Sequence, residues 1–163
     1  MTKLRASSAT IEIVPCKRET AASYWIDTEI TLNYHIQEQQ ITFRFPSDNI
    51  SLQVEDYKRL VGGARQYIST LPVQPITSAN RQLDEFHFMP IEPSFELSLS
   101  SGSYFDESRQ DGRIYVDFKV GLRTLGIQAL AGDQIGCSLE VKIQELVIFF
   151  DSLEQEVNGL LSN

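Results

Sequence analysis

Apolar and polar residues alternate along several stretches of the chain, and each such stretch predicts a β-strand. The longest covers residues 24–36, where nearly every even position is apolar and the odd positions between them are mostly polar. A period of two predicts a strand with one face on a core and the other in water. The polar residues 37–40 that follow predict a hairpin turn. Further strands are predicted at residues 9–14, 41–45, 113–123 and 137–141.

A proline-containing segment lies between two shorter alternating runs. Phe86 and Phe88 share one face of the first run, and residues 95–99 alternate in the second. Pro90 and Pro93 each fix φ and remove a backbone donor, and they favour extended geometry in the residue before them. We therefore expect one strand that enters, bends at the two prolines and continues with one committed apolar face.

Helical spacing replaces this alternation in two places. Apolar residues recur every three or four positions within residues 57–68 and 145–161, which predicts two amphipathic helices. Gly62 and Gly63 lie inside the first of these, where each glycine costs about 1 kcal/mol relative to alanine. The pair marks either close packing of the helix on a sheet or an early break.

The remaining segments have the composition of loops. Residues 71–81 contain two prolines with Ser, Thr and Asn, and residues 124–136 are predicted to be a loop with a short strand at 127–130. Residues 100–111 are rich in Gly, Ser, Asp and Glu and predict a long, exposed hairpin loop. Tyr104 and Phe105 are expected at its tip.

Each half of the chain is thus a set of strands followed by one helix. The run at residues 51–55 resembles the run at 138–142, and both lead into a helix, so duplication of a strands-then-helix unit is one interpretation. The fold class is α+β, with antiparallel sheets of about seven to eight strands and two helices. We expect a single domain over residues 1–163, for which lobes at 9–70 and 82–161 are an alternative description.

The net charge of −8 belongs to the second half of the chain. Residues 1–81 hold nine Lys and Arg against eight Asp and Glu, a balance of +1, whereas residues 82–163 hold five against fourteen, a balance of −9. This acidity argues against binding a nucleic-acid backbone, which is neutralised by basic side chains. It favours long-range attraction to a basic protein partner. A solvated surface that keeps the protein soluble is the simpler alternative.

Motifs for catalysis or cofactor binding are not evident in the sequence. Glu85 and His87 share a strand face, but no second His or Cys is near enough in the sequence to complete a metal site. Residues 106–112 lack the ligand spacing of a calcium loop. A pair such as Glu92 and Glu96 offers acid–base chemistry only in the sense that any acidic domain does. We therefore expect neither an enzyme nor a bound cofactor.

The cysteines and the apolar runs bear on the cellular compartment of the protein. Cys16 and Cys137 are interpreted as buried free thiols, and a disulfide between them cannot be argued from sequence. The first residues contain no apolar core of a secretory signal. No apolar run approaches the roughly 20 residues of a membrane helix. A cytoplasmic protein without a membrane partner is the expectation.

Aromatic residues at polar positions are candidate interface anchors. Trp25 and Tyr115 lie on the polar faces of their strands, and Tyr104 and Phe105 lie in a predicted loop. Trp and Tyr are enriched where proteins bind one another. Burial of Trp25 beneath a second layer is the equally open alternative.

The stretch at residues 88–97 also carries a resemblance to a known family. Its sequence Ile-Glu-Pro-Ser-Phe-Glu-Leu, the following strand at 114–122 and the closing helix with Leu146, Phe149 and Leu153 resemble bacterial immunity proteins of the WapI type. A strand pair with Trp25 and Asp27 and a helix before the prolines fit that layout as well. The chain departs from it at the paired glycines and in the long loop at 100–111.

The resemblance implies a non-catalytic protein that binds and blocks the C-terminal effector domain of a secreted toxin. Such effectors often attack nucleic acid and then carry a basic site. An acidic surface would then act as the plug, with loop aromatics as anchors. A housekeeping structural or regulatory module with an unknown protein partner is the second hypothesis, and a small enzyme or ligand-binding domain is the third. The candidate partner-binding residues are Trp25, Glu92, Glu96, Tyr104, Phe105, Asp106, Glu107 and Asp111.

Overall fold

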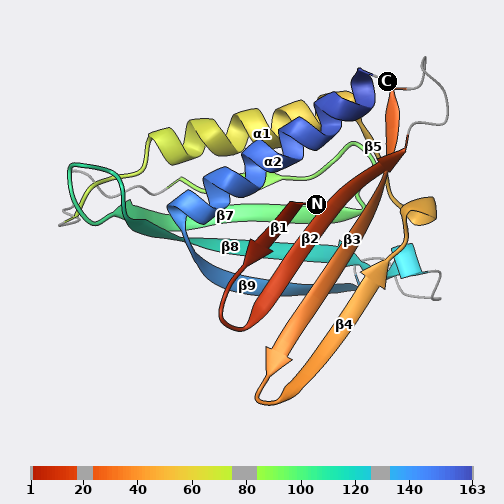
Figure 1. Cartoon of the computed structure of the whole chain (residues 1–163), viewed down its shortest axis with the longest axis horizontal. Coiled ribbons are helices and arrows are strands. Elements are labelled where there is room, and N and C mark those ends of the chain that lie inside the picture. Colours follow the sequence, from red (N-terminus) through yellow and green to blue (C-terminus); the bar gives the residue numbers. More distant parts are fainter. Residues whose placement is uncertain (1, 18–23, 75–83, 126–132, 163) are drawn as a thin grey trace.

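A computed structural model describes residues 2–17, 24–74, 84–125 and 133–162, in which two antiparallel sheets are each followed by one helix (Figure 1). The α+β class is confirmed. The first sheet has the strand order β1-β2-β3-β4, with β5 also pairing with β3, and the second has the order β6-β7-β8-β9. The first-half elements are β1 (Thr2–Arg5), β2 (Ala9–Lys17), β3 (Trp25–Ile36), β4 (Gln39–Phe45), β5 (Ser51–Gln53) and α1 (Val54–Ser69). The second-half elements are β6 (Phe86–Phe88), β7 (Phe95–Tyr104), β8 (Gly112–Gly121), β9 (Gln134–Lys142) and α2 (Ile143–Leu161).

The strand count exceeds the prediction of seven to eight because short strands escaped it. The described residues form nine strands, and β1 pairs in full with β2 although it contains only four residues. Thr2 and Leu4 of β1 point inward and are buried, and Lys3 and Arg5 point outward. Two inward positions are too few for alternation to identify a strand in a sequence. The short strand expected at 127–130 lies outside the described residues.

The expected strand that bends at the prolines is instead a reversal of chain direction. β6 and β7 are antiparallel neighbours, with Phe86 opposite Leu99 and Phe88 opposite Leu97. The prolines therefore lie in a turn, the elbow (residues 89–94), rather than in a continuing strand. Two fixed φ angles do not determine whether a chain bends or turns back, since ψ stays free. The prediction of one committed apolar face in β7 is confirmed, because Phe95, Leu97 and Leu99 are buried.

The long loop expected at residues 100–111 is shorter than predicted. β7 continues to Tyr104, and its pairing with β8 shifts at a bulge between Ser100 and Ser103, where Ser101 adopts a φ of 51°. A bulge accommodates extra residues while the ladder resumes beyond it, so the Gly- and Ser-rich composition is compatible with a strand. Tyr104 is consequently 8% exposed and is not a loop tip. The expectation for Phe105 holds, since it is 42% exposed.

Both predicted helices are present, and α1 runs without a break through its two glycines. A Cβ built on Gly63 would lie 2.4 Å from Cε2 of Phe86, whereas one on Gly62 would meet nothing within 4 Å. Close packing at Gly63 is therefore the reason that a glycine fits there. α1 begins with a capping box in which Gln53 and Asp56 satisfy each other's backbone N–H groups.

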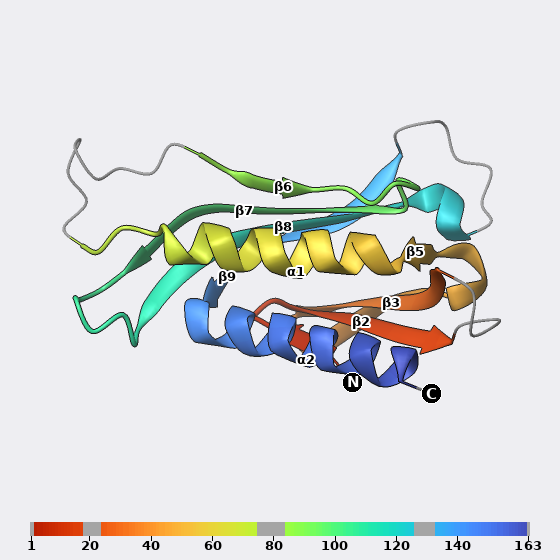
Figure 2. The same ribbon diagram turned by 90° about the horizontal axis from the view of Figure 1, so that it is seen from above.

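The helices run side by side, and each packs on parts of both sheets or their edges (Figure 2). α2 packs mainly on β1 and β2 and also contacts β8 and β9, while α1 packs on α2, β6 and β5. Arg65 of α1 binds Asp151 and Glu154 of α2, with N–O distances of 2.6 and 2.8 Å. The buried apolar side chains of both halves form one cluster.

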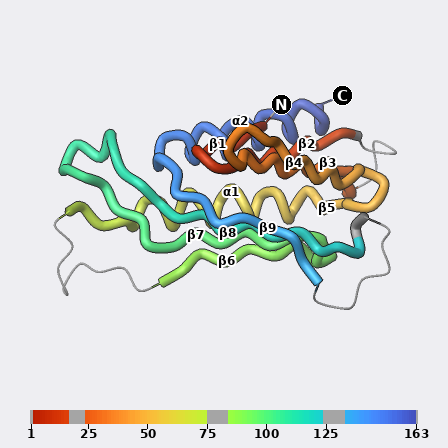
Figure 3. Tube along the Cα trace, turned by 90° about the horizontal axis from the view of Figure 1, so that it is seen from below, coloured from red at the N-terminus to blue at the C-terminus, as the bar shows by residue number. Residues whose placement is uncertain are grey.

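The two sheets lie beside one another with their strands crossing obliquely (Figures 1 and 3). The hydroxyl of Tyr34 on β3 donates a hydrogen bond to the carbonyl oxygen of Gly136 on β9 at 2.7 Å, which joins the two sheets. Neither cysteine is in a disulfide. Cys137 is partly buried but Cys16 is exposed, so the prediction of two buried thiols is wrong for Cys16. No helix in the described part of the chain is long and apolar enough to cross a membrane.

Candidate functional site

The structure brings four of the predicted partner-binding residues together on one projecting loop. This loop, the tip (residues 105–111), connects β7 to β8 beyond the C-terminal end of α1 (Figure 1). Phe105, Asp106, Glu107 and Asp111 are all exposed on it. Tyr104 lies beneath as the last residue of β7 and is buried.

Hydrogen bonds within the tip and to neighbouring elements fasten it. Asp106 Oδ1 accepts from the backbone N–H of Ser108 at 2.9 Å, in an Asx-type turn. Arg109, with a φ of 52°, donates from Nη1 to the carbonyl oxygen of Ser69 at 3.1 Å, and its guanidinium lies 5.4 Å from the ring centroid of Tyr104. The side chain of Gln144 donates to the carbonyl oxygen of Gln110. The tip is thus fastened to the end of α1 and the start of α2.

Two of the other predicted residues, Glu92 and Trp25, lie at the opposite end of α1. Glu92 is exposed in the elbow, which is held against the first turn of α1 because Asp56 accepts from the backbone N–H of Ile91 at 3.2 Å. Trp25 is half-buried at the start of β3, opposite Gln53, the residue before α1. A helix of 16 residues is about 24 Å long. The predicted acidic surface is therefore divided between the two ends of the molecule.

Glu96 belongs to neither end surface, because it is engaged within the second sheet. It is half-buried on the outer face of β7, opposite Lys119 of β8. Gln134 of β9 donates from Nε2 to Glu96 Oε1 at 2.9 Å. A half-buried carboxylate in such a cross-strand contact is less available to a partner than the exposed carboxylates of the tip.

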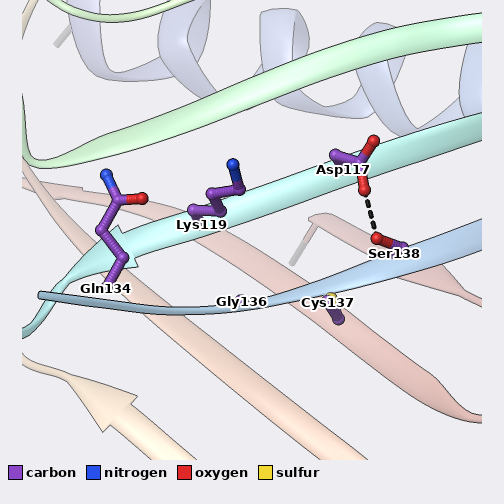
Figure 4. Close-up of a pocket in the computed structure, with 6 residues that line it drawn as sticks. All are labelled: Asp117, Lys119, Gln134, Gly136, Cys137 and Ser138. Atoms are coloured by element: carbon purple, nitrogen blue, oxygen red, sulfur yellow. Dashed lines mark hydrogen bonds between the residues drawn. The ribbon is translucent and has the colours of Figure 1, made fainter.

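An open depression of about 330 Å³ lies beside Glu96 on the outer face of β8 and β9 (Figure 4). Ser138 Oγ donates to Asp117 Oδ1, and no histidine lines the depression to act as a general base. Cys137 also lines the depression, although its side chain points away from Asp117 and Ser138 (Figure 4). Burial together with the Asp117 charge raises the pKa of its thiol to about 11. A thiol with so high a pKa is a poor nucleophile near neutral pH. The depression therefore offers hydrogen bonds but no activated nucleophile.

His87, the histidine considered as a metal ligand, contacts a side chain of the neighbouring strand. His87 Nδ1 lies 2.9 Å from Ser98 Oγ on the neighbouring strand, in the register that places these two residues opposite each other. Among the described residues, no group of three or more His, Cys, Asp or Glu side chains is arranged to hold a metal ion.

Two contacts of this region could not be found from the sequence. On the outer face of the second sheet, Arg113 forms an ion pair with Glu140 across β8 and β9, and Tyr115 also binds Glu140. Hydrogen bonds from Arg113 and Tyr115 lower the pKa of Glu140. The register that opposes Tyr115 to Glu140 depends on how the chain between β8 and β9 connects them, and the sequence of that connection contains no signal for it.

A second hollow, of about 290 Å³, lies between the start of α1 and the end of α2. Its apolar lining comes from the stripes by which the two helices pack, including Tyr57, Val61 and Val157. The Tyr57 hydroxyl is buried and lies 2.5 Å from Thr28 Oγ1, and burial raises its pKa. The Tyr57 hydroxyl is already paired, so the polar groups that this hollow offers a ligand belong to Lys58, Glu154 and Asn158.

Comparison with known proteins gives distant structural similarity and no family. No protein-family model matches the chain, and no curated protein matches it. Among solved structures, that of the plant transcriptional regulator PBF-2 is similar with a TM-score of 0.42 and 9% sequence identity, over 98% of this chain and 81% of that chain.

Proposed function

We propose that this chain is a non-catalytic protein-binding module that neutralises a cognate toxin by direct contact through the tip. The observation that carries the proposal is the exposed Phe105, which stands on a projecting, hydrogen-bonded loop among the exposed carboxylates of Asp106, Glu107 and Asp111. An aromatic anchor ringed by charge is a typical centre of a protein interface.

The fixed conformation of the tip favours binding. A loop that is already ordered loses less conformational entropy when a partner docks, so more of the contact energy appears as affinity. Arg109 and Gln144 fasten the loop from two helices, and Asp106 closes it internally. The loop also projects past the sheets, where it can enter a concave site on a partner (Figure 1).

Charge determines the class of partner. The second half of the chain has a balance of −9 and the tip itself contains three carboxylates against Arg109, so a basic surface is the complementary one. Opposite charges accelerate encounter and suppress wrong partners. Toxin domains that attack nucleic acids have basic sites, and such a domain inside the cytoplasm is the partner that we propose.

The experiment compares variants of the tip with matched variants elsewhere. Phe105→Ala and Glu107→Lys alter the tip without removing its internal hydrogen bonds. Tyr24→Ala and Glu38→Lys are the matched aromatic-to-alanine and charge-reversal changes at exposed positions, immediately before β3 and in the β3–β4 turn. Each protein is used as bait in lysate of the source organism, at low and at high salt, and retained proteins are identified by mass spectrometry.

A basic protein retained by the wild type at low salt, released by high salt and lost from the two tip variants supports the proposal. Its purified effector domain should then be inhibited by the wild type and by both control variants. Equal retention by the tip variants and the controls would rule out the tip. An effector that stays fully active when bound would rule out neutralisation.

A further inference from the structure

The β3–β4 hairpin extends beyond the rest of the molecule and ends in an open sheet edge (Figure 1). β2 pairs with β3 from Asp27 to Tyr34, whereas β4 pairs with β3 as far as the turn. Within the described residues, β4 has β3 as its one neighbour. Its residues 39–42 and 44 are all exposed.

The turn geometry determines which backbone groups of β4 point to the open edge. Two residues connect the strands, Gln37 has a φ of 55°, and Ile36 is opposite Gln39. In a hairpin with a two-residue loop the closing pair exchanges both hydrogen bonds, and hydrogen-bonded pairs alternate from there. The odd positions of β4 therefore bond to β3. Gln40, Thr42 and Arg44 direct their N–H and C=O groups outward.

An apolar patch accompanies this edge on the inner face of the hairpin. The patch consists of Tyr34, Ile36, Ile41 and Phe43, of which Ile36 is 55% exposed and Ile41 is 43% exposed. Tyr34 and Phe43 pack edge to face, with ring centroids 5.9 Å apart. These residues continue the core-facing side of the sheet past the point where the second sheet covers it.

β4 lacks the devices that usually protect an open edge. Natural sheets block their edges with charged side chains, proline, bulges or covering elements. β1, at the other edge of this sheet, carries Lys3 and Arg5 and is packed by α2, and β6 is three residues long. β4 has seven residues, no proline, no register shift and one charge, Arg44.

The β4 sequence is complementary to itself in one antiparallel register. When two copies pair about Thr42, each copy's Gln40 is opposite the other's Arg44, Thr42 is opposite Thr42, and Ile41 is opposite Phe43. This register pairs all three outward-facing residues of both strands and keeps the two Arg44 side chains apart. Thr–Thr and aliphatic–aromatic pairs stabilise neighbouring strands. Shifting the centre by one or two residues loses backbone pairs to the turn or to Pro46.

We propose that this chain forms a two-fold symmetric dimer by antiparallel pairing of β4 with β4 of a second copy. The two first sheets then become one continuous sheet, and the apolar patches of the copies meet across the junction. A two-fold axis closes the assembly after two copies, since each copy uses the same edge. The interface does not involve the tip, so its presence or absence is independent of the proposed function.

Sedimentation equilibrium from low to high micromolar concentration tests the dimer. Thr42→Pro removes an outward backbone N–H without breaking a backbone bond to β3, and it also removes the side-chain hydroxyl that donates to Asn33 Oδ1. Thr42→Val is the control, because it removes the same hydroxyl but keeps the backbone N–H. Thr42→Pro should raise the dissociation constant by at least about tenfold relative to Thr42→Val, because two hydrogen bonds are lost per dimer. Ile41→Lys should also raise the dissociation constant, because it places a charge in the apolar patch that the two copies share.

Cross-linking tests the register. In a Cys16→Ser, Cys137→Ser background, Thr42→Cys should form an intermolecular disulfide on mild oxidation, because opposed Cα atoms in a hydrogen-bonded pair lie about 5.5 Å apart. Gln39→Cys, on the same exposed strand, lies about 20 Å from its copy in this register and should stay reduced.

Several results would overturn the dimer. These are a monomer at every concentration, a dimer that Thr42→Pro and Ile41→Lys leave intact, and equal cross-linking at positions 39 and 42. Salt separates this interface from the tip. Two copies of charge −8 repel, so added salt should tighten the dimer, whereas it should weaken binding of a basic protein at the tip.

Discussion

The buried carboxylate of Asp56 and the backbone N–H of Ile91 are 3.2 Å apart, and their hydrogen bond joins α1 to the elbow of the second sheet. The same carboxylate accepts from the backbone N–H of Gln53 at 3.1 Å and from Arg59 at 2.7 Å. Arg59 in turn donates to the carbonyl oxygen of Met89 at 3.1 Å. One fully buried side chain therefore caps a helix and fixes the turn between β6 and β7.

Asp56→Ala should lower the free energy of unfolding by about 2–4 kcal/mol, because it leaves buried donors and the Arg59 charge without their acceptor. Asp56→Asn should have a smaller effect, since the amide keeps one acceptor oxygen. Urea denaturation followed by circular dichroism measures both. Glu55→Ala, at the exposed neighbouring position, is the control, and an equal loss in both alanine variants would contradict the assigned role.

The two adjacent glycines of α1 should respond oppositely to alanine. Gly62→Ala should stabilise the protein by up to about 1 kcal/mol, since alanine favours the helix and the added methyl group meets open space. Gly63→Ala should be destabilising by about 1–2 kcal/mol, because its methyl group overlaps the Phe86 ring.

Thermal and urea unfolding measure the stability of the two variants. A double-mutant cycle of Gly63→Ala with Phe86→Leu tests whether the Phe86 ring causes the loss. Combined with Phe86→Leu, Gly63→Ala should regain most of its loss, since the shorter side chain vacates the overlap. A Gly63→Ala variant as stable as Gly62→Ala would show that β6 moves aside without cost.

The two thiols should differ in reactivity. Cys16 is exposed, whereas Cys137 is partly buried with its pKa raised to about 11. Iodoacetamide at pH 8 should label Cys137 at least about tenfold more slowly than Cys16, because the thiolate is the reacting form. Peptide mass spectrometry against time measures the two rates, and denaturation in urea should equalise them. Equal labelling of the folded protein would contradict the raised pKa.

The same shift in pKa predicts a pH dependence of stability. The pKa of the Cys137 thiol rises from its ordinary value of 9.0 in the unfolded chain to about 11 in the folded protein. The folded protein therefore keeps this proton to a higher pH. The contribution of the protonated Cys137 thiol to the free energy of unfolding is fully present below pH 9 and is lost as the pH rises through 11. Wild type should therefore lose stability relative to Cys137→Ser over that range and not below it. Parallel urea curves at both ends of the range would exclude the linkage.

Arg65 should couple the helices modestly and in a salt-dependent way. Its contacts with Asp151 and Glu154 are partly exposed, and such pairs contribute about 0.5–1 kcal/mol at low salt. A double-mutant cycle of Arg65→Ala with Asp151→Asn isolates the coupling, which should shrink in high salt. A coupling that does not change with salt would indicate packing by the arginine stem instead.

The sequence predicts those parts of the fold in which a long periodic pattern is decisive. β3 and β8 each present several successive inward residues, so their extent and buried faces follow from alternation. The helical stripe of α2 is equally clear, from Leu146 to Val157. The reversal at the elbow is not predictable in this way, because the group that holds it, Asp56, is 35 residues away from Ile91.

The candidate site illustrates the same limit. Glu96 and Phe105 are near neighbours in sequence, but β7 is extended between them and places them roughly 30 Å apart, at about 3.3 Å per residue. Residues that are close in sequence are therefore far apart in space when an extended strand lies between them. The open edge of β4 was equally hidden, since alternation identifies a strand but does not say which strand lies at the edge of its sheet.

The packing of α2 on β1 has a consequence for how the protein is made. Among the described elements the ribosome completes β1 first and α2 last, so α2 cannot cover the first sheet until nearly all of the described chain has been synthesised. Contacts between such distant segments also slow folding, because a long loop must close before they form. Nascent chains on one messenger will therefore expose apolar strands side by side for most of translation. A chaperone that shields the emerging first sheet should raise the yield of folded protein more than one acting after release.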